Sequence, residues 1–180
     1  MEREMVFDQK FSIVTKDGNE ETFNFFMFED TPIITYKKWE HSFYTNFEAQ
    51  GWTSKDRPDF ANKGLVFIVS ENNTMLDWCA LYHELGHVKN KHPLGLKGRL
   101  GKVTEGIVSP YELEADQYVL KNMGREKTTV WLESLIMYLT DEINKREIYK
   151  ESGYLQEAGL KGLEMYYVSL KEVQLRINYL

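Results

Sequence analysis

The chain has 180 residues, a formal net charge of -6 and ordinary globular fractions of hydrophobic and charged residues, which excludes a disordered or collagen-like protein and predicts one domain over residues 1–180. Its Lys and Arg residues are scattered, so direct binding to nucleic acid is not expected. Cys79, the only cysteine, excludes an intramolecular disulfide and a cysteine-based zinc cluster. Without a signal-peptide pattern or a long apolar stretch, we expect a cytoplasmic location and no membrane partner.

The first part of the chain has the composition of β-structure. Residues 11–15 and 21–28 are rich in β-formers, and the turn-forming residues 16–20 between them predict a β-hairpin. We expect Pro32 to interrupt this structure. Residues 64–69 form a short apolar run that is typical of a strand, either fully buried or at an edge where an extended substrate could pair.

Residues 36–50 are predicted to form a helix. Trp39, Phe43 and Phe47 recur at four-residue spacing, and Gly51 is a natural helix terminator. A second helix is predicted over residues 74–91, where Thr74 is the expected N-cap with Asp77 three residues later.

The rest of the chain is predicted to be helical after one glycine-rich loop. Residues 94–108 carry four glycines and are either a lid, whose Lys and Arg side chains would favour acidic substrates, or a plain connector. Ser109 and Pro110 then open a helix that should stop at Gly124, and amphipathic helices follow over residues 127–180. The last of these helices faces either the core or a partner protein. The fold class expected is α+β, with a small N-terminal sheet and a C-terminal helical part.

The sequence His83-Glu84-Leu85-Gly86-His87 has the H-E-x-x-H form. On a helix, residues four apart lie on one face, so both imidazoles can bind one metal ion while Glu84 points toward a bound water. The apolar stripe of this helix lies opposite the two histidines, and small or apolar residues flank them. We therefore expect the histidine face to be covered by other parts of the protein.

A zinc site of the catalytic type needs three protein ligands and one open position. The downstream candidates are His92, Glu105, Glu112, Glu114 and Asp116. His92 lies at the end of the same helix and is not expected to reach the same ion. Glu112 and Asp116 share one arc of the helix that begins at Pro110, and Glu114 lies on the opposite side. For Glu112, a capping box with Ser109 is the competing explanation.

His83-Glu84-Leu85-Gly86-His87 followed by Glu112-Leu113-Glu114-Ala115-Asp116 resembles the gluzincin pattern H-E-x-x-H…E-x-x-x-D. The pattern is similar to that of the HtpX-type peptidases and, in its short spacing, closer to the ImmA/IrrE family. The resemblance covers about residues 64–124. It implies that His83, His87 and Glu112 bind Zn2+, that Glu84 activates water, and that Asp116 orients a ligand imidazole.

The resemblance also implies a function, namely zinc-dependent hydrolysis of a peptide bond in a cytoplasmic protein such as a transcriptional repressor. The alternative is a non-catalytic regulator with a peptidase fold that binds a partner protein. An intact Glu84 favours the enzyme, since a structural metal site has no use for a base at that position. The donor for the oxyanion stays open among Tyr111, Tyr118 and His92.

Overall fold

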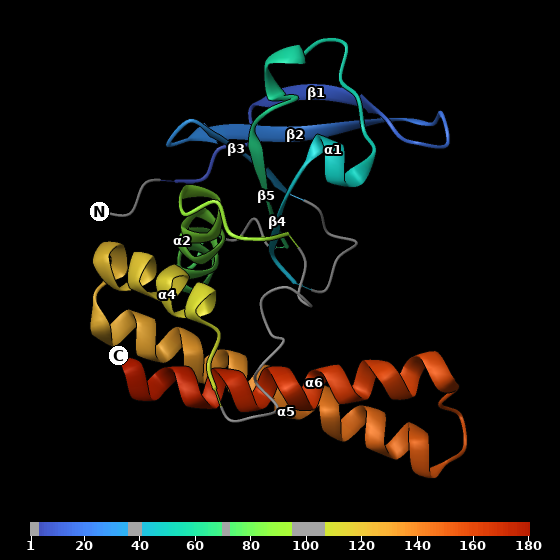
Figure 1. Ribbon diagram of the computed structural model, residues 1–180, viewed down its shortest axis with the longest axis vertical. Helices are drawn as coiled ribbons and strands as arrows, with labels where there is room; N and C mark the ends of the chain where they lie inside the picture. The colour runs from blue at the N-terminus through green and yellow to red at the C-terminus, as the bar shows by residue number, and fades with distance from the viewer. Residues whose placement is uncertain (1–3, 36–40, 70–72, 95–106) are drawn as a thin grey trace. The chain divides into compact units, whose positions relative to one another are not determined.

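The computed structural model describes residues 4–35, 41–69, 73–94 and 107–180 (Figure 1). The chain divides into two compact units, Met1–Leu94 and Gly95–Leu180. The first unit contains a five-stranded sheet and the helix of the H-E-x-x-H motif, and the second contains three long helices, which confirms the α+β class. None of the described helices is long and apolar enough to cross a membrane. The single-domain organisation stays a prediction.

The sheet of the first unit is mixed, with the strand order β1-β2-β3-β5-β4. Its strands are β1 (Gln9–Val14), β2 (Glu20–Phe28), β3 (Thr31–Thr35), β4 (Phe43–Asn46) and β5 (Gly64–Ile68). β1 and β2 pair antiparallel and confirm the predicted hairpin, and only the pairing of β3 with β5 is parallel. Two expectations for this region are wrong.

The helix predicted over residues 36–50 is wrong in its described part. Residues 43–46 form β4, and the helix α1 is limited to Phe47–Gln50, where Gly51 ends it as expected, with a φ of 67°. A four-residue spacing is even, so Phe43 and Phe47 also fit the two-residue period of a strand. In the structure the Phe43 ring stacks on Phe67 of β5 at 4.8 Å between centroids. Residues 36–40 lie outside the described residues.

Pro32 does not interrupt the sheet. It is the second residue of β3 and lies opposite Met27 of β2. Pairing of β3 with β5 begins only at Ile33, so the missing N–H of proline is tolerated at this position.

One face of the sheet carries a buried aromatic core. Because side chains alternate along a strand, every second residue of β1, β2 and β5 faces this core. The ring of Phe60, in the short helix η1 (Pro58–Phe60), packs edge-to-face on Phe11 and Phe25 at centroid distances of 5.2 and 5.3 Å. The buried members are Phe11, Ile13, Phe23, Phe25, Ile34, Phe47, Phe60, Leu65 and Phe67.

The opposite face of the sheet carries the helix α2 (Met75–Lys89), drawn in green in Figure 1. A Cβ atom added to Gly64 would lie 2.7 Å from Cγ1 of Val88, so the helix passes very close to the start of β5. Val66 and Ile68 alternate in phase with Gly64 and therefore face α2. The sheet thus fixes the helix that carries the H-E-x-x-H motif.

All the regular secondary structure in the described part of the second unit is helical. α4 (Pro110–Met123) is followed by α5 (Arg125–Glu151) and α6 (Glu157–Arg176), and a short helix η3 (Ile177–Tyr179) ends it. α5 packs against both α4 and α6, which confirms the predicted C-terminal helices. The glycine-rich segment predicted as a loop over residues 94–108 falls largely on residues 95–106, which lie outside the described residues.

Candidate metal centre

The helix α2 begins as the sequence predicts. The Thr74 hydroxyl accepts the backbone N–H of Asp77 at 3.2 Å, and the Asp77 carboxylate accepts the backbone N–H of Thr74 at 2.8 Å, which completes a capping box. His83 and His87 follow two turns later. Their exposed fractions are 6% and 0%, so the expectation that the histidine face is covered is confirmed.

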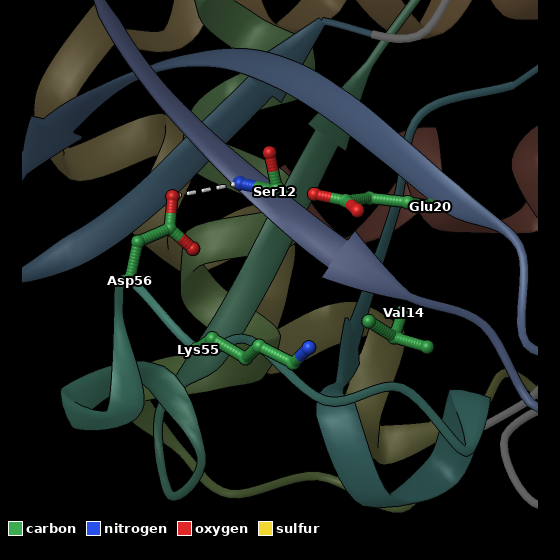
Figure 2. A pocket seen from close by; sticks show the side chains of 5 residues that line it. All are labelled: Ser12, Val14, Glu20, Lys55 and Asp56. Carbon is green, nitrogen blue, oxygen red and sulfur yellow. Dashed lines mark hydrogen bonds between the residues drawn. The ribbon is translucent and has the colours of Figure 1, made fainter.

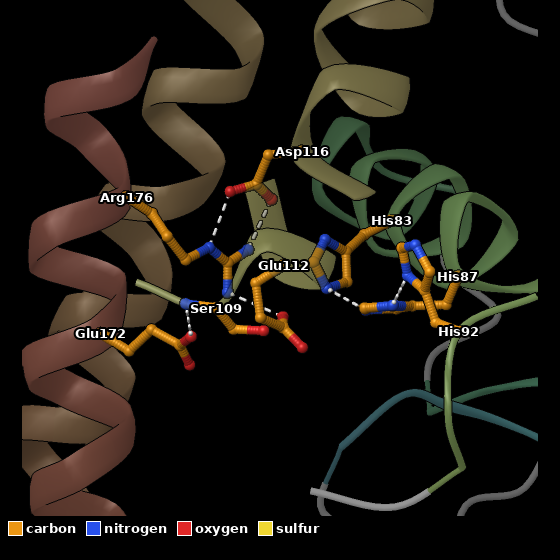
Figure 3. A network of polar contacts seen from close by, with 8 residues as sticks. All are labelled: His83, His87, His92, Ser109, Glu112, Asp116, Glu172 and Arg176. Carbon is orange, nitrogen blue, oxygen red and sulfur yellow. Dashed lines mark hydrogen bonds and ion pairs between the residues drawn. The ribbon is translucent and has the colours of Figure 1, made fainter. Parts of the chain in front are cut away.

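The two histidines of the motif converge through their Nε2 atoms, which are 3.1 Å apart (Figure 3). Their rings are nearly perpendicular, at 88°. Two imidazole nitrogens that bind one tetrahedral zinc ion at 2.0–2.1 Å would be about 3.3–3.4 Å apart. The pair therefore has nearly the separation that a shared ion requires.

Glu84 is buried as well, with an exposed fraction of 7%. It directly follows His83 on α2, and the capped, regular helix fixes where its backbone lies. A buried carboxylate that directly follows a candidate metal-binding histidine has the chemistry of a general base.

His92 folds back onto the other side of His87, which the sequence did not predict. Its Nδ1 lies 2.8 Å from the Nδ1 of His87. A Schellman turn ends α2: the N–H of His92 donates to the carbonyl of His87 at 3.0 Å, and the N–H of Lys91 donates to that of Val88 at 3.1 Å. Lys91 adopts a φ of 53° in this turn. Glycine usually marks such a turn, and Lys91 gave no such signal.

Tyr44 of the edge strand β4 contacts both His87 and His92. Its ring stacks on His87, with centroids 5.2 Å apart and an angle of 11° between the planes. Its hydroxyl donates to the backbone carbonyl of His92 at 2.5 Å and also contacts that of Pro93. Because β4 was predicted as helix, Tyr44 was not among the candidate site residues.

The second unit carries the predicted carboxylates on α4. Glu112 and Asp116 are buried, with exposed fractions of 5% and 1%, whereas Glu114 is exposed. The predicted shared arc of Glu112 and Asp116 is therefore confirmed. Glu105 lies outside the described residues.

Arg176 from the end of α6 binds both carboxylates (Figure 3). Its Nε and Nη2 donate to the two oxygens of Asp116 at 2.7 and 2.5 Å, and its Nη1 donates to Glu112 Oε2 at 3.3 Å. Burial would lower the pKa of Arg176, but the carboxylate of Asp116, followed by Glu112 and Glu172, raises it above its ordinary value. The guanidinium is therefore permanently charged. Sequence reasoning missed this residue.

The capping-box explanation for Glu112 is wrong. In the described part of the chain, the Ser109 side chain makes no capping hydrogen bond. The backbone N–H of Ser109 donates instead to Glu172 Oε1 of α6 at 3.3 Å. Glu112 is thus not needed to cap its own helix.

β5 is not at an edge of the sheet. It lies between β3 and β4, so an extended substrate cannot pair along it, and the alternative of an interior strand is confirmed. The edge strand on this side is β4.

A separate shallow pocket of about 260 Å³ lies on the first unit (Figure 2). It is lined by Ser12, Val14, Glu20, Lys55 and Asp56. The Asp56 carboxylate accepts the backbone N–H of Ser12 at 3.0 Å, and this hydrogen bond is the main cause that lowers the pKa of Asp56. The pocket includes none of the histidines.

No protein-family model matches this chain, and comparisons with curated proteins and with solved structures found no significant similarity. The resemblance to gluzincins therefore stays a hypothesis that rests on the residues of the motif.

Proposed function

We propose that the chain is a zinc-dependent peptidase in which His83, His87 and Glu112 hold the metal and Glu84 is the general base. The observation that carries this proposal is the 3.1 Å approach of the two Nε2 atoms on α2, a helix on which Glu84 is also buried. The proposal keeps the substrate class that the resemblance implies, a peptide bond in a cytoplasmic protein such as a repressor.

The chemistry of the donor set fits zinc. Two imidazoles and one carboxylate, all buried, could hold a metal ion, and this combination leaves a fourth position open in catalytic zinc sites. Around Arg176, one positive charge serves the three carboxylates of Glu112, Asp116 and Glu172, an excess of negative charge that favours a nearby cation. In this proposal Asp116, which accepts two hydrogen bonds from Arg176, orients a ligand imidazole.

When bound, zinc would supply Lewis-acid chemistry, lowering the pKa of a water and polarising the scissile carbonyl. Among the side chains of the protein, Glu84 acts as the general base. Its carboxylate accepts the proton of the attacking water and then donates it to the nitrogen of the leaving amine. Burial of Glu84 keeps competing water away from this transfer.

The test is zinc content together with activity in three variants. Glu84→Gln should keep zinc and lower kcat on labelled casein or quenched fluorescent peptides by roughly 10²–10⁴-fold, because the base is lost. Glu112→Gln should weaken zinc binding, whereas Glu114→Gln, on the exposed side of the same helix, should change neither zinc content nor activity.

The outcomes separate the two functional classes. A wild-type protein that binds zinc and hydrolyses the substrate, together with a Glu84→Gln variant that keeps zinc but loses turnover, supports the peptidase. A protein that binds zinc but shows no turnover distinguishable from Glu84→Gln would instead support the non-catalytic regulator. Absence of zinc binding would overturn the proposal.

A further inference from the structure

We infer that His92 is a positioning residue that holds the His87 ring with Nε2 directed toward the metal, an inference that rests on the proposed function. Its basis is the contact between the Nδ1 atoms of His87 and His92, 2.8 Å apart and buried. The two rings meet at 71°, with centroids 5.0 Å apart. This is hydrogen-bond geometry between two side chains of the same residue type.

The contact selects one tautomer for each ring. A hydrogen bond between two nitrogens needs a proton on one of them and a lone pair on the other. If Nε2 of His87 binds the metal, the neutral ring carries its proton on Nδ1 and must donate. His92 then accepts at Nδ1 and carries its own proton on Nε2. In many metal sites a carboxylate or carbonyl accepts this hydrogen bond, and here an imidazole takes that place.

The acceptor is itself held in place by the backbone. The Schellman turn at the end of α2 ties the N–H of His92 to the carbonyl of His87, and the Tyr44 hydroxyl donates to the carbonyl of His92. The Tyr44 ring also covers one face of His87. Both imidazoles therefore have little freedom to rotate before a metal arrives.

The same geometry separates His92 from the ligand set. The pair formed by His83 and His87 meets through Nε2, whereas His92 contacts His87 on the opposite side of its ring, at Nδ1. One ring offers its two nitrogens in divergent directions, so His92 supports the ligand and does not replace it.

The first experiment needs no variant. In zinc-loaded protein labelled with 15N, two-dimensional NMR of the imidazole nitrogens should show His87 protonated at Nδ1 and His92 protonated at Nε2. A zinc-loaded protein with His87 protonated at Nε2, or with His92 protonated at Nδ1, would overturn the inference.

The second experiment measures zinc affinity by competition with a chromophoric chelator. His92→Leu removes the acceptor and should weaken affinity by about 10–100-fold, the usual effect of losing such a partner. His92→Asn places an amide oxygen near the position of Nδ1 and should restore most of the affinity. His41→Leu, at an exposed histidine of the same unit, should leave affinity unchanged.

Failure of the inference and failure of the proposed function give different results. Zinc affinity that is the same in wild type, His92→Leu and His92→Asn would overturn the positioning role while the metal site stands. A wild type that binds no zinc would overturn both. An equal loss of zinc affinity in His92→Leu and His92→Asn, with both variants folded by circular dichroism, would show that the hydrogen-bond acceptor is not what matters. That result would also overturn the positioning role of His92.

Discussion

Arg176 is the residue that holds the carboxylates of the second unit. It is 5% exposed and forms a bidentate ion pair with Asp116 besides its bond to Glu112. Removing one member of a buried pair leaves the other charges in a medium that solvates them poorly. The stability of the helices and the position of Glu112 therefore depend on one guanidinium.

Replacing Arg176 with Leu should lower the free energy of unfolding by about 3–5 kcal/mol, because three buried carboxylates lose their cation. Arg176→Lys should keep only part of the free energy of unfolding that Arg176→Leu loses, since an ammonium cannot make the bidentate contact. Urea unfolding measures both. Lys161→Leu, which breaks an exposed pair with Glu157, is the control and should change stability by less than about 1 kcal/mol. Equal losses at the two positions would contradict this account.

Gly64 is the point of closest approach between β5 and α2. The Cβ atom of an alanine would meet Val88, whose branched side chain has little freedom to move, so Gly64→Ala should destabilise the protein by about 1–3 kcal/mol. Gly162→Ala is the matched control: it lies within α6 with nothing inside 4 Å of an added Cβ, and should stabilise the helix by about 0.5–1 kcal/mol. Thermal unfolding measures the change in stability of both variants. A change of the same sign in Gly64→Ala and Gly162→Ala would refute the steric explanation.

Among the elements, the turn that ends α2 contains a residue with a strained backbone, Lys91, and its hydrogen bonds place His92 against His87. Lys91 adopts a left-handed conformation, which costs a non-glycine residue on the order of 1 kcal/mol. Lys91→Gly should therefore raise the free energy of unfolding by a similar amount and leave zinc affinity unchanged, because the hydrogen bonds of the turn are kept. Lys89→Gly, at the last residue of α2, should instead lower stability, because it also removes the hydrogen bond from Lys89 Nζ to the backbone carbonyl of Glu29. Stability that falls in Lys91→Gly would count against the described turn.

The elements also show what local sequence can predict. α2 was predictable because its cap and its apolar period agree, and the arc of Glu112 and Asp116 followed from helical geometry alone. The strand β4 was not predictable, because the four-residue spacing of Phe43 and Phe47 fits both the period of a helix and the period of a strand. The fold-back of His92 was missed since its turn has Lys91 where a glycine would have marked it.

For the whole molecule, a metal ion that binds the folded chain and not the unfolded chain stabilises the fold. Zinc should therefore raise the Tm of the wild type, with stabilisation of about 2.7 kcal/mol when free zinc is one hundred times Kd, and a chelator should reverse the effect. Magnesium at the same concentration is the control, because it prefers oxygen ligands. A Tm that does not respond to zinc would contradict the proposed centre.

Long-range pairs set the limit of sequence-based prediction here. Arg176 lies 60 residues from Asp116, and Tyr44 lies 48 residues from His92, so no local spacing connects them. Local reasoning identified the residues that are proposed to bind metal and perform chemistry. It could not identify the residues that hold them, because those contacts exist only after the chain has folded.

The position of Trp131 gives the protein an internal optical reporter. The guanidinium of Arg176 lies over its indole ring, 5.8 Å from the centroid, so the emission of this tryptophan senses the charge beside it. In a chain whose other three tryptophans are replaced by phenylalanine, a change in fluorescence on adding a cation would register events at the neighbouring carboxylates without any attached dye.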